Sequence, residues 1–209
     1  FGYGLSYTTF DWKLIDSQVD GQGGNITCKV EVTNTGDTAG KDVVQLYYSA
    51  PYTKGGIEKS AVNLGAFAKT DELQPGESQT LELTMVFDDM ASFDEKGNGC
   101  YVMDEGTYTF TLRTDAHTVK EGQSFTYDLA GQIIYNEEND GKRSTDETAA
   151  VVQDEFQDAA TLETNMTYLS RADFAGTFPK VERRLNPTSV PEEVKARLEA
   201  NGPGSSVMD

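Results

Sequence analysis

The sequence predicts a mainly β fold: a β-sandwich of seven or eight strands over residues 11–130, followed by an acidic linker with one or two short helices. Three observations support this prediction. Apolar residues alternate with polar ones in a series of short runs, Gly, Pro and Asn turn signals separate these runs, and the alternation stops near Gly131. The 209 residues have room for one such domain and additional segments.

The first half of the sandwich is predicted from the alternation of apolar and polar residues. Side chains spaced two apart in a strand share one face, which predicts inward-facing sets in the first two runs: Phe10, Trp12 and Leu14, then Ile26, Cys28, Val30 and Val32. A turn at 34–37 leads to residues 42–50, whose nearly continuous apolar run is typical of a central strand. A loop at 51–60 follows, after which Leu64 and Phe67 are expected to anchor a shorter strand.

The second half begins with the clearest turn. Pro75 and Gly76 occupy the central positions of a type II turn, where the second residue needs a positive φ. Three further strands are predicted from their inward residues: Leu81, Leu83, Met85 and Phe87; Tyr108, Phe110 and Leu112; and Phe125, Tyr127 and Leu129. Tyr108 is predicted to form a tyrosine corner, in which its hydroxyl ties down the preceding loop.

The chain changes character after the last strand. Residues 136–163 carry nine acids against two basic residues, with hardly any strand pattern. Ser144 and Glu147 have capping-box spacing, and apolar residues follow at helical intervals, so we expect one amphipathic helix there. A second short helix is predicted to start at Ser189, with Pro191 in its first turn, and to stop near Gly202.

Charge and composition exclude several kinds of partner. The formal net charge of −18 argues against nucleic acid and against an anionic membrane surface, since both need a basic face. No apolar run approaches the roughly 18 residues of a membrane-spanning helix. His117 is the only histidine, so a zinc site would lack ligands, and neither cysteine has a plausible His partner for a nucleophilic pair. No cofactor or metal is expected.

The two cysteines, Cys28 and Cys100, allow two interpretations. An immunoglobulin-like disulfide would be accompanied by a Trp on the third strand and a Tyr two residues before the second Cys. The sequence has Tyr47 and Tyr48 on the third strand and Asn98 before Cys100, which favours two free thiols. The lack of a clear disulfide favours a cytoplasmic over a secreted location, and the compartment stays otherwise open.

Acidic residues could suggest calcium or carboxylate chemistry. Residues 136–147 and 94–105 approximate EF-hand loops, but Asn136 and Lys96 stand where calcium-binding Asp residues belong. Neighbouring acids such as Asp88 and Asp89, or Asp104 and Glu105, are interpreted as solvated turns. No catalytic carboxylate pair is predicted among them.

Residues 1–8, Phe-Gly-Tyr-Gly-Leu-Ser-Tyr-Thr, resemble the end of the α/β sandwich domain of glycoside hydrolase family 3. The segments that follow resemble the fibronectin type III-like domain of that family, which is an immunoglobulin-like sandwich: 32–36, 40–48, 64–67, 73–77 and 106–108. Residues 168–179 resemble the lead-in to the catalytic barrel in members with reversed domain order. The resemblance therefore implies four parts: 1–10 as the end of a preceding α/β sandwich domain, 11–130 as the fibronectin-like domain, 131–165 as the linker, and 166–209 as the lead-in to a barrel.

The family resemblance also implies a function. Many members are β-glucosidases or related retaining, exo-acting enzymes, whose nucleophile is an Asp of the barrel and whose acid/base is usually a Glu of the α/β sandwich. Neither segment is among these residues, so no residue here inherits a catalytic role. The expected function is accessory: this part organises the catalytic domains of the same chain, which bind the carbohydrate. A carbohydrate-binding module and a stand-alone interaction or adhesion domain remain alternatives.

Three tyrosines are candidates for contact with substrate or with a neighbouring domain: Tyr3, Tyr47 and Tyr52. Sugars stack on exposed aromatic rings, and the glycine-containing loop 51–60 could present such rings. The alternative is that Tyr48 faces the core while Tyr47 packs on a neighbouring domain.

Overall fold

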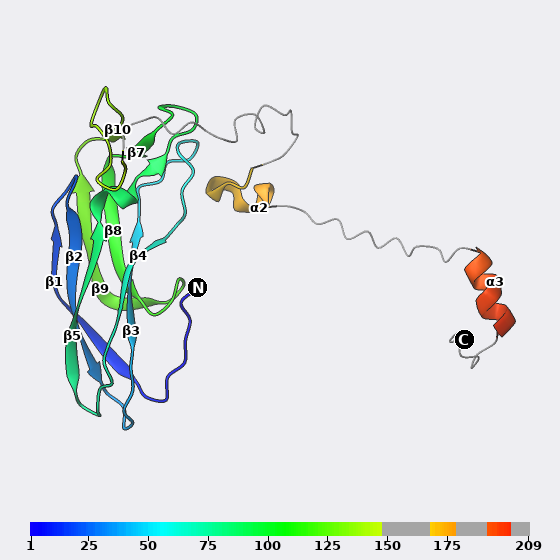
Figure 1. Cartoon of the computed structure of the whole chain (residues 1–209), viewed down its shortest axis with the longest axis horizontal. Coiled ribbons are helices and arrows are strands. Elements are labelled where there is room, and N and C mark those ends of the chain that lie inside the picture. Colours follow the sequence, from blue (N-terminus) through cyan, green and yellow to red (C-terminus); the bar gives the residue numbers. More distant parts are fainter. Residues whose placement is uncertain (148–167, 179–191, 202–209) are drawn as a thin grey trace.

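A computed structural model describes residues 1–147, 168–178 and 192–201. Its main body is a sandwich of two antiparallel sheets (Figure 1). The first sheet has the order β1-β2-β5: β1 (Phe10–Val19), β2 (Asn25–Asn34) and β5 (Ser78–Val86). The second has the order β4-β3-β8-β9: β4 (Asn63–Lys69), β3 (Val43–Ser49), β8 (Gly106–Arg113) and β9 (Val119–Leu129). These seven strands confirm the predicted mainly β sandwich.

Smaller elements complete the described part of the chain. A third sheet, at one end of the sandwich in Figure 1, has the order β10-β7-β6: β10 (Ile133–Tyr135), β7 (Tyr101–Met103) and β6 (Ser92–Phe93). The helical elements are η1 (Phe87–Met90), η2 (Arg171–Asp173), α2 (Phe174–Thr177) and α3 (Glu192–Asn201). Helix α3 confirms the predicted C-terminal helix, whereas most of the helix predicted after Ser144 lies outside the described residues. No helix in the described ranges is long and apolar enough to cross a membrane.

The core forms between the inner faces of the two large sheets. All four predicted inward residues of β2 are buried, as are Tyr108, Phe110 and Leu112 of β8. The rings of Phe110 and Phe125 stack with centroids 4.7 Å apart, which joins β8 to β9 through their side chains. Each fully buried aliphatic or aromatic side chain of this kind contributes about 1.5–3 kcal/mol, so this shared core holds the sheets together.

Two local predictions are confirmed by backbone and side-chain geometry. Gly76 has φ +80°, and the amide of Glu77 donates to the carbonyl of Gln74 at 2.9 Å, as the predicted turn requires. The buried Tyr108 donates its hydroxyl to the carbonyl of Asp104 at 3.1 Å, which ties the turn before β8 to the core. Both cysteines are free and buried, which confirms the prediction of two thiols.

The prediction that Phe67 helps to anchor β4 is wrong. Phe67 is 69% exposed, and Ala66 and Ala68 pack against the core instead. Residues three apart in a regular strand face opposite sides, so Leu64 and Phe67 cannot both point inward. The small alanines leave β4 with a thin inner face and place its largest side chain on the outside.

The outer face of the β1-β2-β5 sheet carries matched polar pairs. Across β2 and β5, the hydroxyls of Thr27 and Thr84 lie 3.3 Å apart and those of Thr33 and Ser78 lie 2.7 Å apart. Lys29 and Glu82 lie between these pairs, with 3.7 Å between the ammonium and carboxylate. Such exposed pairs contribute little individually, and they keep this face hydrophilic.

The polypeptide remains attached to the sandwich beyond residue 130. β10 pairs with β7, and Tyr135 is buried. Its hydroxyl donates to Asp88 at 2.7 Å, and the same carboxylate accepts the amides of Ser144 at 2.8 Å and Gly23 at 3.1 Å. Burial raises the pKa of Asp88, but these donors outweigh it and lower the pKa below its ordinary value.

Asp88 corrects a second prediction, since it is only 1% exposed and does not lie in a solvated turn. Its carboxylate joins three segments that are far apart in the sequence. Residues 133–144 are thereby fixed on the end of the sandwich.

Candidate functional site

The N-terminal segment lies along the outside of the β4-β3-β8-β9 sheet. The carbonyl of Phe1 accepts the amide of Ala116 at 3.0 Å, and the carbonyl of Gly2 accepts the side-chain amide of Gln45 at 3.2 Å. Gln45 also donates to the carbonyl of Thr114 at 2.8 Å. Gly2 has φ +77°, and a Cβ there would lie 2.9 Å from Cδ of Gln45, so this close approach requires glycine.

The other end of this segment is held by Asn34, the last residue of β2. Its buried side-chain oxygen accepts the hydroxyl of Thr8 at 2.8 Å and the amide of Gly36 at 3.1 Å. Its NH₂ group donates to the carbonyls of Thr38 and Leu73, both at 2.8 Å. Every donor and acceptor of this amide is therefore used, which fixes the backbone around Thr8.

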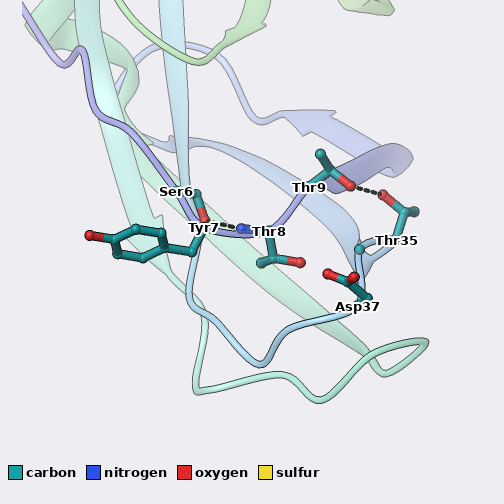
Figure 2. A pocket seen from close by; sticks show the side chains of 7 residues that line it. Ser6, Tyr7, Thr8, Thr9, Thr35 and Asp37 are labelled. Atoms are coloured by element: carbon teal, nitrogen blue, oxygen red, sulfur yellow. Dashed lines mark hydrogen bonds between the residues drawn. The ribbon is translucent and has the colours of Figure 1, made fainter.

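A surface hollow lies where the segment meets the turn after β2. It is lined by residues 6–9 and 35–37, and Figure 2 shows the hydrogen bond between the hydroxyls of Thr9 and Thr35, which is 3.0 Å long. In this view Tyr7 points away from Thr9, Thr35 and Asp37, and it is fully exposed. The hollow is mostly hydroxyl-lined and lies next to an uncovered aromatic ring.

The large side chains of the N-terminal segment are exposed although its backbone is anchored at both ends. The exposed fractions are 81% for Phe1, 75% for Tyr3, 89% for Leu5 and 100% for Tyr7, and we call these four residues the N-terminal strip. A fixed backbone with four uncovered apolar side chains is typical of a surface that another body covers. Tyr3, one of the three candidate tyrosines, belongs to this strip.

Tyr47, the second candidate, offers no exposed face. It is 2% exposed, its hydroxyl donates to Gln45 at 3.0 Å, and the guanidinium of Arg113 lies 5.6 Å from its ring centroid. Tyr48 packs against the core, as one of the two interpretations predicted, and its hydroxyl donates to the carbonyl of Asp89 at 3.3 Å. Tyr47 therefore holds the side chain of Gln45, which in turn bonds to Gly2 of the N-terminal segment.

Tyr52, the third candidate, lies in the loop between β3 and β4. Its hydroxyl donates to the carboxylate of Glu58 at 3.2 Å. The neighbouring Lys59 is buried and forms an ion pair with Asp104, while its ammonium also donates to the carbonyl of Pro51 at 3.1 Å. A charge this deeply buried is tolerated only when paired, so Lys59 fixes the loop to the turn before β8.

The segment 168–178 contacts the same loop. The amide of Arg171 donates to Glu58 at 2.5 Å and the hydroxyl of Ser170 donates to it at 3.2 Å. The guanidinium carbon of Arg171 lies 4.6 Å from the ring centroid of Tyr52. The amide of Arg171 is the main reason that the pKa of Glu58 is lowered from its ordinary value.

The acidic and amide side chains of the described loops take part in local structure. No group of three or more His, Cys, Asp or Glu side chains among them could hold a metal ion. In the two EF-hand-like stretches the side-chain oxygens accept internal hydrogen bonds: Asp94 accepts the amides of Gly97 and Asn98, and Asn136 accepts that of Glu138. The described geometry fixes backbone segments and leaves apolar side chains exposed on them.

The roles of Glu58, Lys59 and Arg171 were missed at the level of sequence. Glu58 and Arg171 are 113 residues apart, and a single Glu or Arg outside a repeat carries no pairing signal. The available hint was that 168–179 resembles the lead-in to a catalytic barrel, which did not indicate where it would dock.

Comparisons with known proteins show that most of the sandwich is similar to one part of much larger proteins. Residues 42–116 match the fibronectin type III-like domain family. β-Glucosidase A of Butyrivibrio fibrisolvens is 42% identical over 150 residues, covering 64% of this chain and 18% of the relative. A β-glucosidase of Ruminococcus albus is 43% identical over 132 residues, covering 61% and 13%.

Solved structures agree with the sequence relatives. The β-glucosidase of Paenibacillus barengoltzii superposes with a TM-score of 0.57 at 43% identity, covering 64% of this chain and 15% of that one. β-Glucosidase 3B of Thermotoga neapolitana, in complex with glucose, gives 0.54 at 37% identity, covering 63% and 17%. The chain spans less than a fifth of the length of these relatives.

Proposed function

We propose that the sandwich, which matches the fibronectin type III-like domain family, is the accessory domain of a glycoside hydrolase family 3 enzyme and serves as a non-catalytic, organising part of that β-glucosidase-like protein. In this proposal the enzyme is retaining and exo-acting, and its catalytic domains belong to the same chain. The carbohydrate substrate is bound by those domains. The sandwich holds them in the relative position that catalysis needs.

One observation supports the proposal above the others: the anchored and uncovered N-terminal strip. Its backbone is bonded to Ala116 and Gln45 at one end and to the Asn34 region at the other, so its position is fixed before any partner arrives. A preceding domain that packs on Tyr3, Leu5 and Tyr7 would inherit that position. Positioning matters because a shift of about 1 Å between reacting groups can cost on the order of 100-fold in rate.

The alternative of a carbohydrate-binding module receives less support. Such a module needs aromatic rings that are open to a sugar face. Of the three candidate tyrosines, Tyr47 is buried and Arg171 lies over Tyr52, so only Tyr3 in the N-terminal strip has an open ring. A calorimetric titration of this chain with cello-oligosaccharides distinguishes the two functions. We expect no measurable heat of binding, and saturable binding would favour the module instead.

The organising role is tested in a chimera. The matching region of β-glucosidase A from B. fibrisolvens is replaced by residues 1–147 of this chain, and hydrolysis of p-nitrophenyl β-glucoside is measured. We expect the double substitution Tyr3→Ser and Tyr7→Ser to lower kcat/KM about tenfold by uncoupling the domains. Ile15→Ser is the matched control, because Ile15 is a half-exposed apolar residue of β1 outside the strip. Equal rates for the chimera and its double variant would overturn the proposal.

A further inference from the structure

Two segments more than 100 residues apart meet at the loop between β3 and β4. We propose that Tyr52 and Glu58 form a receptor for Ser170 and Arg171, and that this contact, the clasp, fixes the segment 168–178 to the sandwich. The clasp does not depend on the proposed organising function, and its test measures no enzyme activity. It assigns the loop a binding partner that lies within the same chain.

The receptor side is rigid before the partner binds. The buried ammonium of Lys59 pairs with Asp104, whose other carboxylate oxygen accepts the side-chain amide of Gln132 at 2.9 Å. Lys59 follows Glu58 directly, so this buried anchor fixes the backbone next to the exposed carboxylate. The hydroxyl of Tyr52 then orients the Glu58 carboxylate from the other side of the loop. The acceptor oxygens are therefore already in place.

The partner side has its own local structure. The hydroxyl of Ser170 accepts the amide of Ala172 at 3.1 Å, and Asp173 accepts the amide of Gly176 at 2.9 Å. Thr177 closes the turn, because its hydroxyl accepts the amide of Ser170 at 2.8 Å and donates to the carbonyl of Asp173 at 2.7 Å. These bonds account for the neighbouring amides. The amide of Arg171 and the hydroxyl proton of Ser170 are left for an outside acceptor.

The two sides match in number and in charge. Each oxygen of Glu58 accepts one donor from the docked segment, Arg171 N–H on Oε1 and Ser170 O–H on Oε2, in addition to the Tyr52 hydroxyl. The guanidinium of Arg171 lies over the Tyr52 ring, a cation–π arrangement that also neutralises the adjacent carboxylate. Hydrogen bonds to an ionised acceptor are stronger than neutral ones, so Glu58 is the central residue of the clasp.

The clasp also sets the direction of an apolar surface. Tyr168, Leu169, Phe174 and Phe178 are at least half exposed, and the rings of Phe174 and Phe178 lie 5.3 Å apart. These four side chains are presented by the docked segment. Release of Arg171 would let them move independently of the sandwich.

Tryptic cleavage after Arg171 in the full 209-residue chain tests the clasp. A protease needs an extended, accessible segment, whereas docking holds the Arg171 side chain on Tyr52 and its amide on Glu58. We expect Glu58→Ala to accelerate this cleavage about tenfold, as loss of charge-assisted hydrogen bonds implies. Glu72→Ala, which removes an exposed acid from another loop, is the matched control and should cleave like wild type. Cleavage after Arg197 in α3 is the internal reference.

A second measurement distinguishes loss of the clasp from unfolding of the whole domain. Hydrogen exchange by NMR reports the Arg171 amide directly, and we expect exchange to become about tenfold faster in Glu58→Ala and also in Arg171→Ala. Glu58 is exposed, so the Trp12 emission of a folded core should not change. Equal cleavage and exchange in wild type and Glu58→Ala would overturn the clasp. Wild-type cleavage as fast as that of an unstructured peptide would overturn it too.

Discussion

Among the polar side chains of this domain, we expect Asn34 to contribute the most to the free energy of unfolding. It is fully buried at the end of β2 and uses its amide to join the N-terminal segment, its own turn and the loop before β5. Replacing Asn34 with Ala leaves two acceptors and two donors without their partner. The substitution removes little apolar contact, so the effect measures the polar network.

The magnitude follows from the four hydrogen bonds. Those to Thr8 and Leu73 are buried, and each orphaned group costs about 1.5 kcal/mol. Those to Gly36 and Thr38 are part-buried, so water can replace Asn34 there and each costs about 0.5 kcal/mol. The expected loss is therefore about 4 kcal/mol, a large share of the 5–15 kcal/mol typical of a domain.

Urea unfolding followed by Trp12 fluorescence measures this loss. Trp12 is the only tryptophan and is 3% exposed, so its emission reports the opening of the core. Asn98→Ala is the matched control, because Asn98 is exposed and its side chain makes one hydrogen bond to Asp94. We expect the control to lose about 0.5 kcal/mol. A loss below about 1 kcal/mol for Asn34→Ala would refute the network argument.

Three further outcomes are expected. Lys59→Met should lower the free energy of unfolding by about 2–3 kcal/mol, because it leaves the carboxylate of Asp104 without its cation at a site that water partly reaches. The same urea titration measures this loss, and an unchanged unfolding midpoint would contradict the prediction. The clasp should be intact above the ordinary Glu58 pKa of 4.5 and be lost as pH falls through the lowered pKa, since only the ionised carboxylate accepts strongly from Arg171. The exchange rate of the Arg171 amide, corrected for its intrinsic pH dependence, reports this loss. Protection of that amide that persists below the lowered pKa would contradict the prediction. Burial raises the pKa of Cys28 to about 12, so its thiol should resist DTNB in the folded chain and react only in urea; labelling of Cys28 at the rate of free cysteine would contradict the buried position.

The sequence predicted elements whose information is local. Strict alternation in Ile26–Val32 indicates one buried face, and Pro75-Gly76 requires one type of turn, so β2, β5 and the turn between residues 74 and 77 were predictable. Phe67 was assigned to the inner face because β4 is apolar, although a residue three positions after Leu64 faces the opposite side of a strand. β10 was missed since three residues beside an acidic run are too short to show a period.

The candidate site was less predictable, because it depends on contacts between distant residues. The exposed aromatics of residues 1–8 were visible as a motif, and Tyr3 was a candidate from sequence. The burial of Tyr47 could not be predicted, because its hydroxyl bonds to Gln45, whose amide in turn bonds to Gly2, 43 residues away. The paired partners Lys59–Asp104 and Glu58–Arg171 lie on loops, where no periodicity predicts which charges meet.

The ladder of Thr, Ser, Lys and Glu pairs across β2 and β5 has a practical consequence. The N-terminal strip lies along the outside of the other large sheet, and the clasp lies on the loop between β3 and β4. A cysteine introduced at Thr84 or Lys29 would therefore carry a dye, a spin label or a sensor-chip linkage without touching either contact. Immobilised by that face, the domain would present its two docking regions to solution in one known orientation.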